Sequence, residues 1–264
     1  MLGQLSTIWK FRHFWLSLVV MDLRTRYRRS VLGVGWSLMN PIMMTAVFCV
    51  VFSSWLNNPD WRQYGPWFLA GLTLFDFVRS SALSGCTTFF RNESYIRQCP
   101  LPLAIYTLRT VLGAAIHYLI ALGVVLAAVC VLQPHHISSM LSVLWTLIPS
   151  LLLLFMFCWA ISIIASFMTV YFQDSQQILE VLFQVFFFLT PIMYSPQMLK
   201  DRGLGILLQL NPVCTFFELI RETIITGNIA PIWAYQKAII VVSVFGAMAI
   251  GCIARLERKL IFHL

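Results

Sequence analysis

A short polar segment lies between two long apolar stretches, and its residue types suit contact with another protein. Two arginines and one glutamate fall within seven residues, and Pro100 ends the segment. This pattern predicts a one- or two-turn helix held between two longer helices, where it would act as a rigid lever. A plain turn between two helices fits the same pattern. The residues assigned to this coupling segment are Arg91, Asn92, Glu93, Ser94, Tyr95, Ile96 and Arg97.

Polar and aromatic side chains also recur at helical spacing further along the chain. Gln177, Glu180, Gln184, Phe187 and Phe188 fall near one face of a predicted helix. A carboxylate and two amides are costly in contact with lipid, so this face should meet protein or water. Because amides bond hydroxyls and aromatic rings stack on sugars, the face suits the wall of a sugar conduit. A helix–helix interface held by polar side chains is the alternative.

Residues 196–231 predict two short amphipathic helices, at 204–210 and 213–225, with an Asn-Pro break between them. Such helices, joined to a proline-ended span, would dip back into the bilayer as an outer gate. Re-entrant backbone needs cover from protein or water, which implies a dimer or a lumen. An outer cap without a gating role is the alternative. The residues assigned to the gate are Asn211, Pro212, Phe217, Glu218 and Arg221.

Residues for catalysis or metal binding do not form a recognisable set. The chain has ten acids, no cluster of histidine with acids, and no GxxxxGK[ST] loop for ATP. Asp76 and Arg79 are spaced to neutralise each other, and a proton relay would need further acids and histidines. His117 stands alone, and the pair His135-His136 has no third ligand nearby. We therefore expect no catalytic residue, no metal site and no cofactor bound by this chain. A membrane glycosyl- or acyltransferase would need a general base or paired carboxylates.

The composition places these residues in a membrane protein. Of 264 residues, 59% are hydrophobic and 11% are charged, against about 25% charged in soluble domains. This excludes an ordinary soluble enzyme and a disordered chain. The net charge of +8 comes from cations beside apolar runs, which indicates membrane topology and no nucleic-acid partner. The seven cysteines lack CxxC spacing, so no disulfide framework is expected.

The fold expected is an all-α integral membrane protein with one transmembrane domain over 1–264. Six stretches satisfy the need for about 20 mostly apolar residues. The predicted spans are 31–55, 66–88, 104–132, 140–170, 178–195 and 232–254. An amphipathic helix over 4–29 should lie in the membrane interface, either as an anchor or as a further contact for a partner. The outer gate helices lie between spans five and six.

Lysine and arginine set the expected orientation. Eleven lie before the first span, in the loop after the second and in the tail, and four lie in the opposite loops. The positive-inside rule therefore places both termini in the cytoplasm.

Several motifs resemble one known family. Arg26-Tyr27-Arg28-Arg29-Ser30-Val31-Leu32-Gly33, with Trp36-Ser37-Leu38-Met39-Asn40-Pro41, resembles the start of the first span in ABC-2-type permeases that export polysaccharides. Tyr171-Phe172-Gln173-Asp174 with Thr190-Pro191-Ile192-Met193-Tyr194 is similar to the fourth-to-fifth span connection. Asn211-Pro212 with Glu218 and Arg221 is similar to the outer segment. Gln173 departs from the pattern, which has a basic residue before the aspartate.

The resemblance implies a homodimeric permease subunit that binds two copies of a separate ABC ATPase, which holds ATP and Mg. Its coupling helix would be the 91–97 segment. Spans one and five border the channel in similar proteins, which adds Asn40, Pro41 and Tyr194 to the conduit. The substrate implied is a lipid-linked glycan of O-antigen or teichoic-acid type, crossing the cytoplasmic membrane. The alternative is an ABC-2 exporter of a drug, lipid or small natural product. A secondary transporter would favour inverted repeats, which the sequence lacks.

Overall fold

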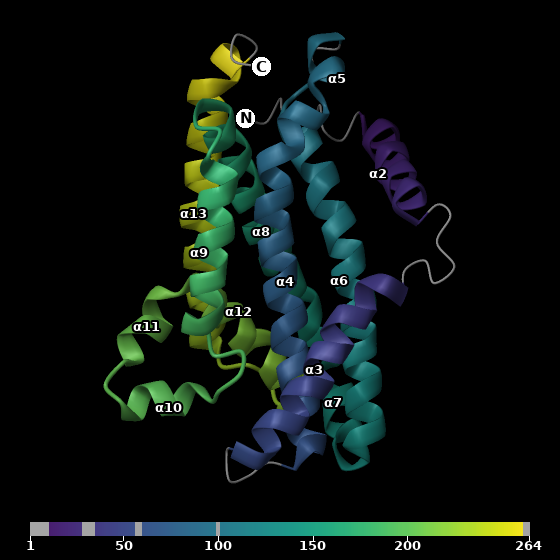
Figure 1. Cartoon of the computed structure of the whole chain (residues 1–264), viewed down its shortest axis with the longest axis vertical. Helices are drawn as coiled ribbons and strands as arrows, with labels where there is room; N and C mark the ends of the chain where they lie inside the picture. The colour runs from purple at the N-terminus through teal and green to yellow at the C-terminus, as the bar shows by residue number, and fades with distance from the viewer. Residues whose placement is uncertain (1–10, 28–34, 56–59, 99–100, 261–264) are drawn as a thin grey trace.

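The computed structural model describes residues 11–27, 35–55, 60–98 and 101–260, and every regular element in these ranges is a helix (Figure 1). In chain order they are α2 (Arg12–Tyr27), α3 (Gly35–Trp55), α4 (Trp61–Arg91), α5 (Glu93–Gln98), α6 (Ala104–Leu132), η1 (Pro134–His136), α7 (Ile137–Val143), η2 (Leu144–Thr146), α8 (Leu147–Tyr171), α9 (Ser175–Leu189), α10 (Pro196–Asp201), α11 (Gly205–Leu210), α12 (Pro212–Arg221), η3 (Glu222–Thr226) and α13 (Ile232–Leu260). The all-α expectation is confirmed for these residues.

Helix α4 is the central element, because α3, α6, α8, α9 and α12 all pack against it. Its 31 residues give a length of about 46 Å. Small residues let α8 come close. A Cβ added at Gly85 would lie 2.8 Å from the carbonyl oxygen of Ser162, and the Ser166 hydroxyl donates to the Gly85 carbonyl at 2.8 Å. Larger side chains such as Phe68 and Phe75 complete the core around this contact.

The outer surface of the helices is apolar. Three helical stretches are long and apolar enough to cross a membrane: Ala104–Leu132, Pro134–Tyr171 and Ile232–Leu256. Val131 and Ile232 are each 76% exposed, as expected for side chains that face lipid. Leu38–Val51 and Ser175–Leu189 are shorter apolar helices.

The two ends of the bundle differ in their elements. Figure 1 shows α5 and the C-terminal end of α13 at one end, with α2 beside α6 on the same half. The short helices α10 and α11 lie toward the opposite end, as do η1 and α7. Helix α4 runs between these ends, from Trp61 to Arg91.

The predicted ranges agree with the helices best where no proline intervenes. The range 104–132 coincides with α6, and 232–254 lies within α13. The range 178–195 is too long at its end, because α9 stops at Leu189 and Thr190 is extended before Pro191. The range 140–170 lies within the apolar helical stretch Pro134–Tyr171, in which the short turn η2 separates α7 from α8. Helix α10 was not predicted.

The N-terminal helix is described only in part. Of the predicted 4–29, α2 covers Arg12–Tyr27 and Phe11 precedes it in a turn, while residues 4–10 and 28–29 lie outside the described residues. Leu18 and Val19 are buried, on the helix that packs against α6, whereas His13 and Ser17 are exposed. Helix α2 thus packs against α6 through one side and exposes side chains on another.

The expected orientation can be tested at the two ends of α4. Asp60 is exposed at its start, and Ser94 is exposed just beyond its end. In intact cells, an impermeant thiol reagent should label Asp60→Cys. It should label Ser94→Cys only after the membrane is opened, with the unsubstituted chain giving the background. Labelling of Ser94→Cys from outside would reverse the orientation.

Candidate functional site

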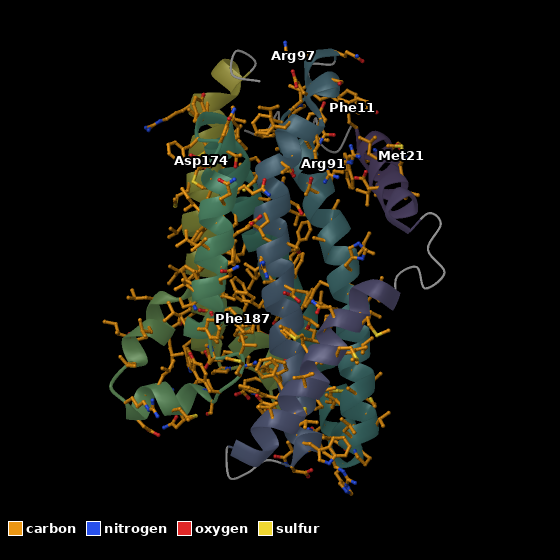
Figure 2. All side chains as sticks on the ribbon, viewed as in Figure 1. Phe11, Met21, Arg91, Arg97, Asp174 and Phe187 are labelled. Carbon is orange, nitrogen blue, oxygen red and sulfur yellow. The ribbon has the colours of Figure 1, made fainter. Side chains whose placement is uncertain are left out.

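The coupling segment forms a helix with two inward anchors. Helix α5 begins at Glu93, and Arg97 Nε bonds Glu93 Oε1 at 2.9 Å. Asn92 and Ile96 are buried. Arg91, Ser94, Tyr95 and Arg97 are exposed, and Figure 2 shows Arg97 at the end of the bundle, with Arg91 further in, toward α2. The segment therefore presents charged and aromatic side chains outward from a fixed base.

Asn92 is the joint between α4 and α5. Its backbone N–H donates to the Phe89 carbonyl at 3.2 Å and so caps α4. Its own carbonyl accepts from the backbone N–H groups of Tyr95 and Ile96, each at 3.0 Å, which begins α5. Its side-chain amide donates to the Thr88 carbonyl at 2.7 Å. One buried residue thus sets the angle between the two helices.

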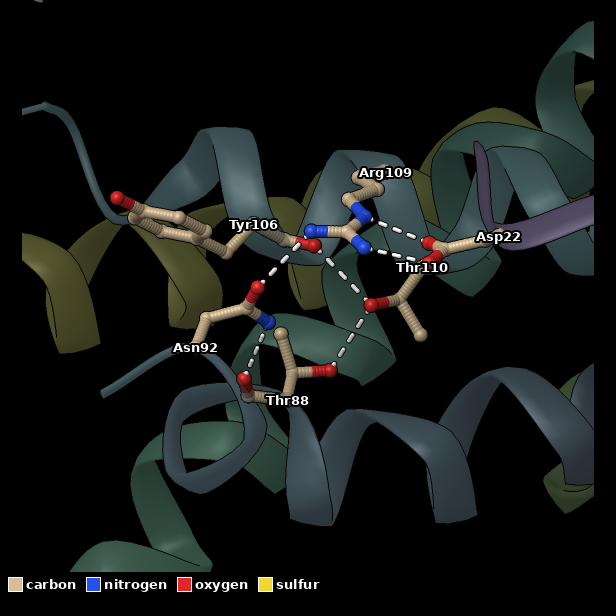
Figure 3. A network of polar contacts seen from close by, with 6 residues as sticks. All are labelled: Asp22, Thr88, Asn92, Tyr106, Arg109 and Thr110. Carbon is tan, nitrogen blue, oxygen red and sulfur yellow. Dashed lines mark hydrogen bonds and ion pairs between the residues drawn. The ribbon is translucent and has the colours of Figure 1, made fainter. Parts of the chain in front are cut away.

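Arg109 on α6 connects this joint to α2 (Figure 3). Its Nη1 donates to Asn92 Oδ1 at 3.0 Å. Its Nε and Nη2 form a two-pronged ion pair with Asp22, at 2.6 and 2.5 Å. Nearby, the Thr88 and Thr110 hydroxyls lie 3.0 Å apart, across α4 and α6. We call Asp22, Thr88, Asn92, Arg109 and Thr110 the inner network.

The inner network fixes α2 and α5 to the same guanidinium. Arg109 is 9% exposed, and a paired, bidentate contact is the arrangement that suits a buried arginine. Any movement of α5 that shifts Asn92 must act on Arg109, and through it on Asp22 of α2. The sequence assigned Asn92 to the coupling segment, but it identified neither Arg109 nor Asp22 as a partner of that residue. The available signal was Asp22, an acid that interrupts the apolar side of the N-terminal amphipathic helix.

A second buried arginine organises the outer end. The Arg221 guanidinium donates from Nη1 to the Pro191 carbonyl at 2.7 Å and from Nη2 to the Ile192 carbonyl at 3.3 Å. Its Cζ lies 3.7 Å from the centre of the Trp67 ring and 4.8 Å from that of Phe217. Arg221 is 7% exposed and forms no ion pair with a described carboxylate. Burial lowers its pKa to about 9, so it stays charged at neutral pH.

Two further side chains hold the non-helical segment that follows α9. Asn211 Nδ2 donates to the Thr190 hydroxyl at 2.8 Å, while its Oδ1 accepts from the Val213 N–H and caps α12. The Tyr64 hydroxyl of α4 donates to the Met193 carbonyl at 2.9 Å. We call residues 190–195 with these partners and Arg221 the outer elbow. Two sequence motifs separated by more than fifteen residues therefore meet at one place.

The other gate residues lie around the elbow. Pro212 is the first residue of α12, and Phe217 is buried beneath Arg221. Glu218 is half-buried, and this burial raises the pKa of its carboxyl. Glu218 forms none of the hydrogen bonds described for the outer elbow. Trp67 was not predicted from the sequence, because an aromatic residue in an apolar span gives no signal of a cation partner.

The residues predicted for a conduit on α9 divide between two sides. Gln177, Gln184 and Phe188 are exposed. Glu180 is half-buried and accepts from Gln176 Nε2 at 3.2 Å. Phe187 is also half-buried, with its ring centre 5.5 Å from that of Phe75 on α4 (its position is marked in Figure 2). The exposed side of α9 is therefore the part left for a partner, a substrate or lipid.

The remaining conduit residues lie on α3 and beside α9. Pro41 is inside α3 and buried, and its carbonyl accepts from the Thr45 hydroxyl at 2.7 Å. Asn40 is exposed. The Tyr194 hydroxyl donates to the Phe188 carbonyl at 2.8 Å, at the open end of α9. No group of three or more histidine, cysteine, aspartate or glutamate side chains suited to a metal occurs among the described residues.

Comparison with known proteins gives the family. The sequence matches the family described as ABC-2 type transporter over residues 13–225. The chain belongs to this family. As an ABC-2 protein with these apolar helices, it is a multi-pass membrane protein. The matched region contains the whole inner network and the whole outer elbow.

Three relatives of this ABC-2 chain share one name, "O-antigen export system permease protein RfbA". One from Klebsiella pneumoniae is 26% identical over 206 residues, which is 78% of each chain. A second from the same species is 24% identical over 208 residues, 79% of this chain and 78% of the relative. A third, from Myxococcus xanthus, is 24% identical over 221 residues, 81% of this chain and 80% of the relative.

The outer elbow predicts a steric effect at Gly71. A Cβ there would overlap Arg221 Nη2, whereas one at Gly113 would meet nothing within 4 Å. Gly71→Ala should therefore destabilise the purified protein, by about 1–3 kcal/mol in thermal unfolding. Gly113→Ala, the matched control inside α6, should be neutral or slightly stabilising. Equal thermal unfolding temperatures for the two variants would contradict the close packing of Arg221 against α4.

The inner network predicts coupling between α2 and α6. Asp22→Asn and Arg109→Met should each lower stability by about 1–3 kcal/mol, because each removes charge-assisted hydrogen bonds. The double variant should cost less than the sum of the two, since no cation is then left without its partner. Thermal unfolding of the four proteins measures this difference. Additive losses would show that the two side chains act independently.

Proposed function

We propose that this chain is the transmembrane subunit of an ATP-driven exporter that moves a lipid-linked polysaccharide, of O-antigen or teichoic-acid type, across the cytoplasmic membrane. The observation that carries the proposal is the extent of the similarity. The chain matches three proteins named as O-antigen export permeases over 78–81% of its length, and the family match runs from α2 to the outer elbow. Similarity confined to one span would not support a shared function in this way.

The arrangement within the membrane is part of the proposal. A single domain over 1–264 would have six spans, with α3, α4 and α9 added to the three apolar helical stretches, and α2 would lie in the interface. Both termini would be cytoplasmic. Two features support this: α5 and the end of α13 lie at the same end of the bundle (Figure 1), and α4 is long enough to cross. Helix α4 is less apolar than the three apolar helical stretches because it carries charged residues, including Asp76 and Arg79.

The motor in this proposal is a separate ABC ATPase, bound in two copies to a homodimer of this chain. ATP and Mg would be held by that partner. The exposed face of α5 supports the contact, because it presents charged and aromatic side chains on a base fixed by Asn92. A push on α5 would reach α4 through the cap and α2 through Arg109.

The outer elbow would act as the gate of the exporter. Its non-helical backbone is held by side-chain donors from α4 and α12, and such contacts can be broken and remade without unfolding a helix. The exposed side of α9, with Gln177, Gln184 and Phe188, would contribute to the conduit together with Asn40 of α3.

The function can be tested in cells from which the gene for this chain is deleted. Surface polysaccharide should disappear while its lipid-linked form accumulates inside, and a copy of the gene should restore export. Unchanged surface polysaccharide would contradict the glycan substrate. In that case a drug, a lipid or a small natural product would be the cargo to test.

Charge reversal on α5 tests the coupling contact. Glu93→Lys combined with Arg97→Glu keeps an ion pair at the same spacing but inverts the charges offered to a partner. The local effect on α5 should be small, since exposed ion pairs contribute at most about 1 kcal/mol. Export should fall more than tenfold, and less ATPase should co-purify, while membrane abundance stays the same. Ser94→Ala is the control, and normal export by the swapped variant would remove α5 from the contact.

A further inference from the structure

A cavity of about 710 Å³ lies between α4 and α6, separate from the exposed side of α9. Pro41 of α3 and Asp22 of α2 complete its lining. The volume falls within the range of about 300–1,000 Å³ that is usual for ligand sites. The cavity extends beside α4 from Thr73 to the joint at Asn92, which is the part of α4 nearer α5.

One face of α4 supplies a row of hydroxyl groups to this cavity. Thr73, Ser80, Ser84 and Thr88 line it at steps of seven and four residues, and Thr110 of α6 lies opposite. Thr73, Ser80 and Thr88 donate to carbonyls of their own helix, at 2.8–3.1 Å. Their oxygens therefore still have lone pairs with which to accept hydrogen bonds. A row of acceptors along one wall of the cavity suits a ligand that carries several donors.

Asp76 lies on the same face and lines the same cavity. It is half-buried, and its carboxylate has no hydrogen bond or ion pair with another described residue. Arg79 was expected to neutralise it, but the two do not form an ion pair. A carboxylate that is partly removed from water needs donors, so a ligand with neighbouring hydroxyl groups suits it.

Two aromatic rings complete the wall beside Asp76. Phe77 and Tyr118 both line the cavity, and their rings stack with centres 5.0 Å apart and an angle of 5° between the planes. Because the two rings stack on each other and are each 4% exposed, they form an apolar backing beside Asp76. A carboxylate and a row of hydroxyls next to an apolar wall suit a pyranose, whose hydroxyl groups donate at its edge while its C–H faces are apolar.

We propose that this cavity is a carbohydrate-binding site, in which Asp76 accepts hydrogen bonds from sugar hydroxyls and α4 and α6 form part of the path of the glycan. The inference rests on the proposed function. It adds α4 and α6 to the conduit, which the sequence analysis assigned to spans one and five alone. The residues that carry it are Asp76, Phe77, Ser80, Ser84 and Tyr118.

A photoreactive side chain tests contact with sugar directly. A diazirine amino acid placed at Ser84 of the full chain, in cells that make the polysaccharide, should give on illumination a cross-linked band that stains for carbohydrate after periodate oxidation. The same amino acid at Leu119, which is 52% exposed on α6 and does not line the cavity, should give none. A band at Ser84 that contains phospholipid and no carbohydrate would overturn the inference.

Export measurements provide the second readout. Ser84→Phe should fill the cavity and lower surface polysaccharide at least tenfold at equal membrane abundance, whereas Leu119→Phe should not. Asp76→Asn, which has nearly the same volume, should also lower export. Normal export by Ser84→Phe would overturn the cavity as part of the path while leaving the proposed function intact. Loss of the whole gene without loss of surface polysaccharide would instead contradict the proposed function.

Discussion

A guanidinium taken out of water must be given acceptors, and this requirement joins segments of the chain that lie far apart in sequence. Arg109 brings Asp22 of α2 and Asn92 at the joint of α4 and α5 to one point. Arg221 brings the carbonyls of Pro191 and Ile192 to α12 and stacks on Trp67. In both cases the alternative is an unpaired buried charge, which is far more costly than the loss of a surface contact. These two arginines explain why irregular backbone is held in place in an otherwise helical protein.

Both arginines also connect the segments that they hold to α4. Asn92 is the C-cap of that helix, and Trp67 belongs to its opposite half. Helix α4 has 31 residues and packs against both α6 and α8, so it is the element that extends from the joint at Asn92 to Trp67 and beyond. In the proposed exporter, the ATPase contact and the outer elbow are therefore connected by one continuous rod. The proposed carbohydrate site lies along that rod, so movement of α4 would alter the surface that the sugar meets.

Much of the fold could be predicted because lipid imposes a simple rule, namely a continuous apolar helix of sufficient length. The range of α6 was predicted to the residue. The motifs at 190–194 and 211–221 were selected separately, and the structure brings them into contact through Asn211 with Thr190 and through Arg221 with Pro191. The sequence could not identify which residues form hydrogen bonds or ion pairs with the buried arginines. Arg109 has several acids within the chain to choose from, and only packing of α2 against α6 selects Asp22. The end of α9 was misplaced because an apolar stretch continues past the point at which Pro191 stops the helix.

The shortness of α9 has a consequence for the surrounding lipid. Its 15 residues rise only about 22 Å, against a hydrocarbon thickness of about 30 Å. As a proposed span it therefore leaves a hydrophobic mismatch on the side where the outer elbow begins, and lipid must thin there or be displaced by α10 and α11. The thickness and composition of the bilayer consequently act as a mechanical load on this part of the molecule.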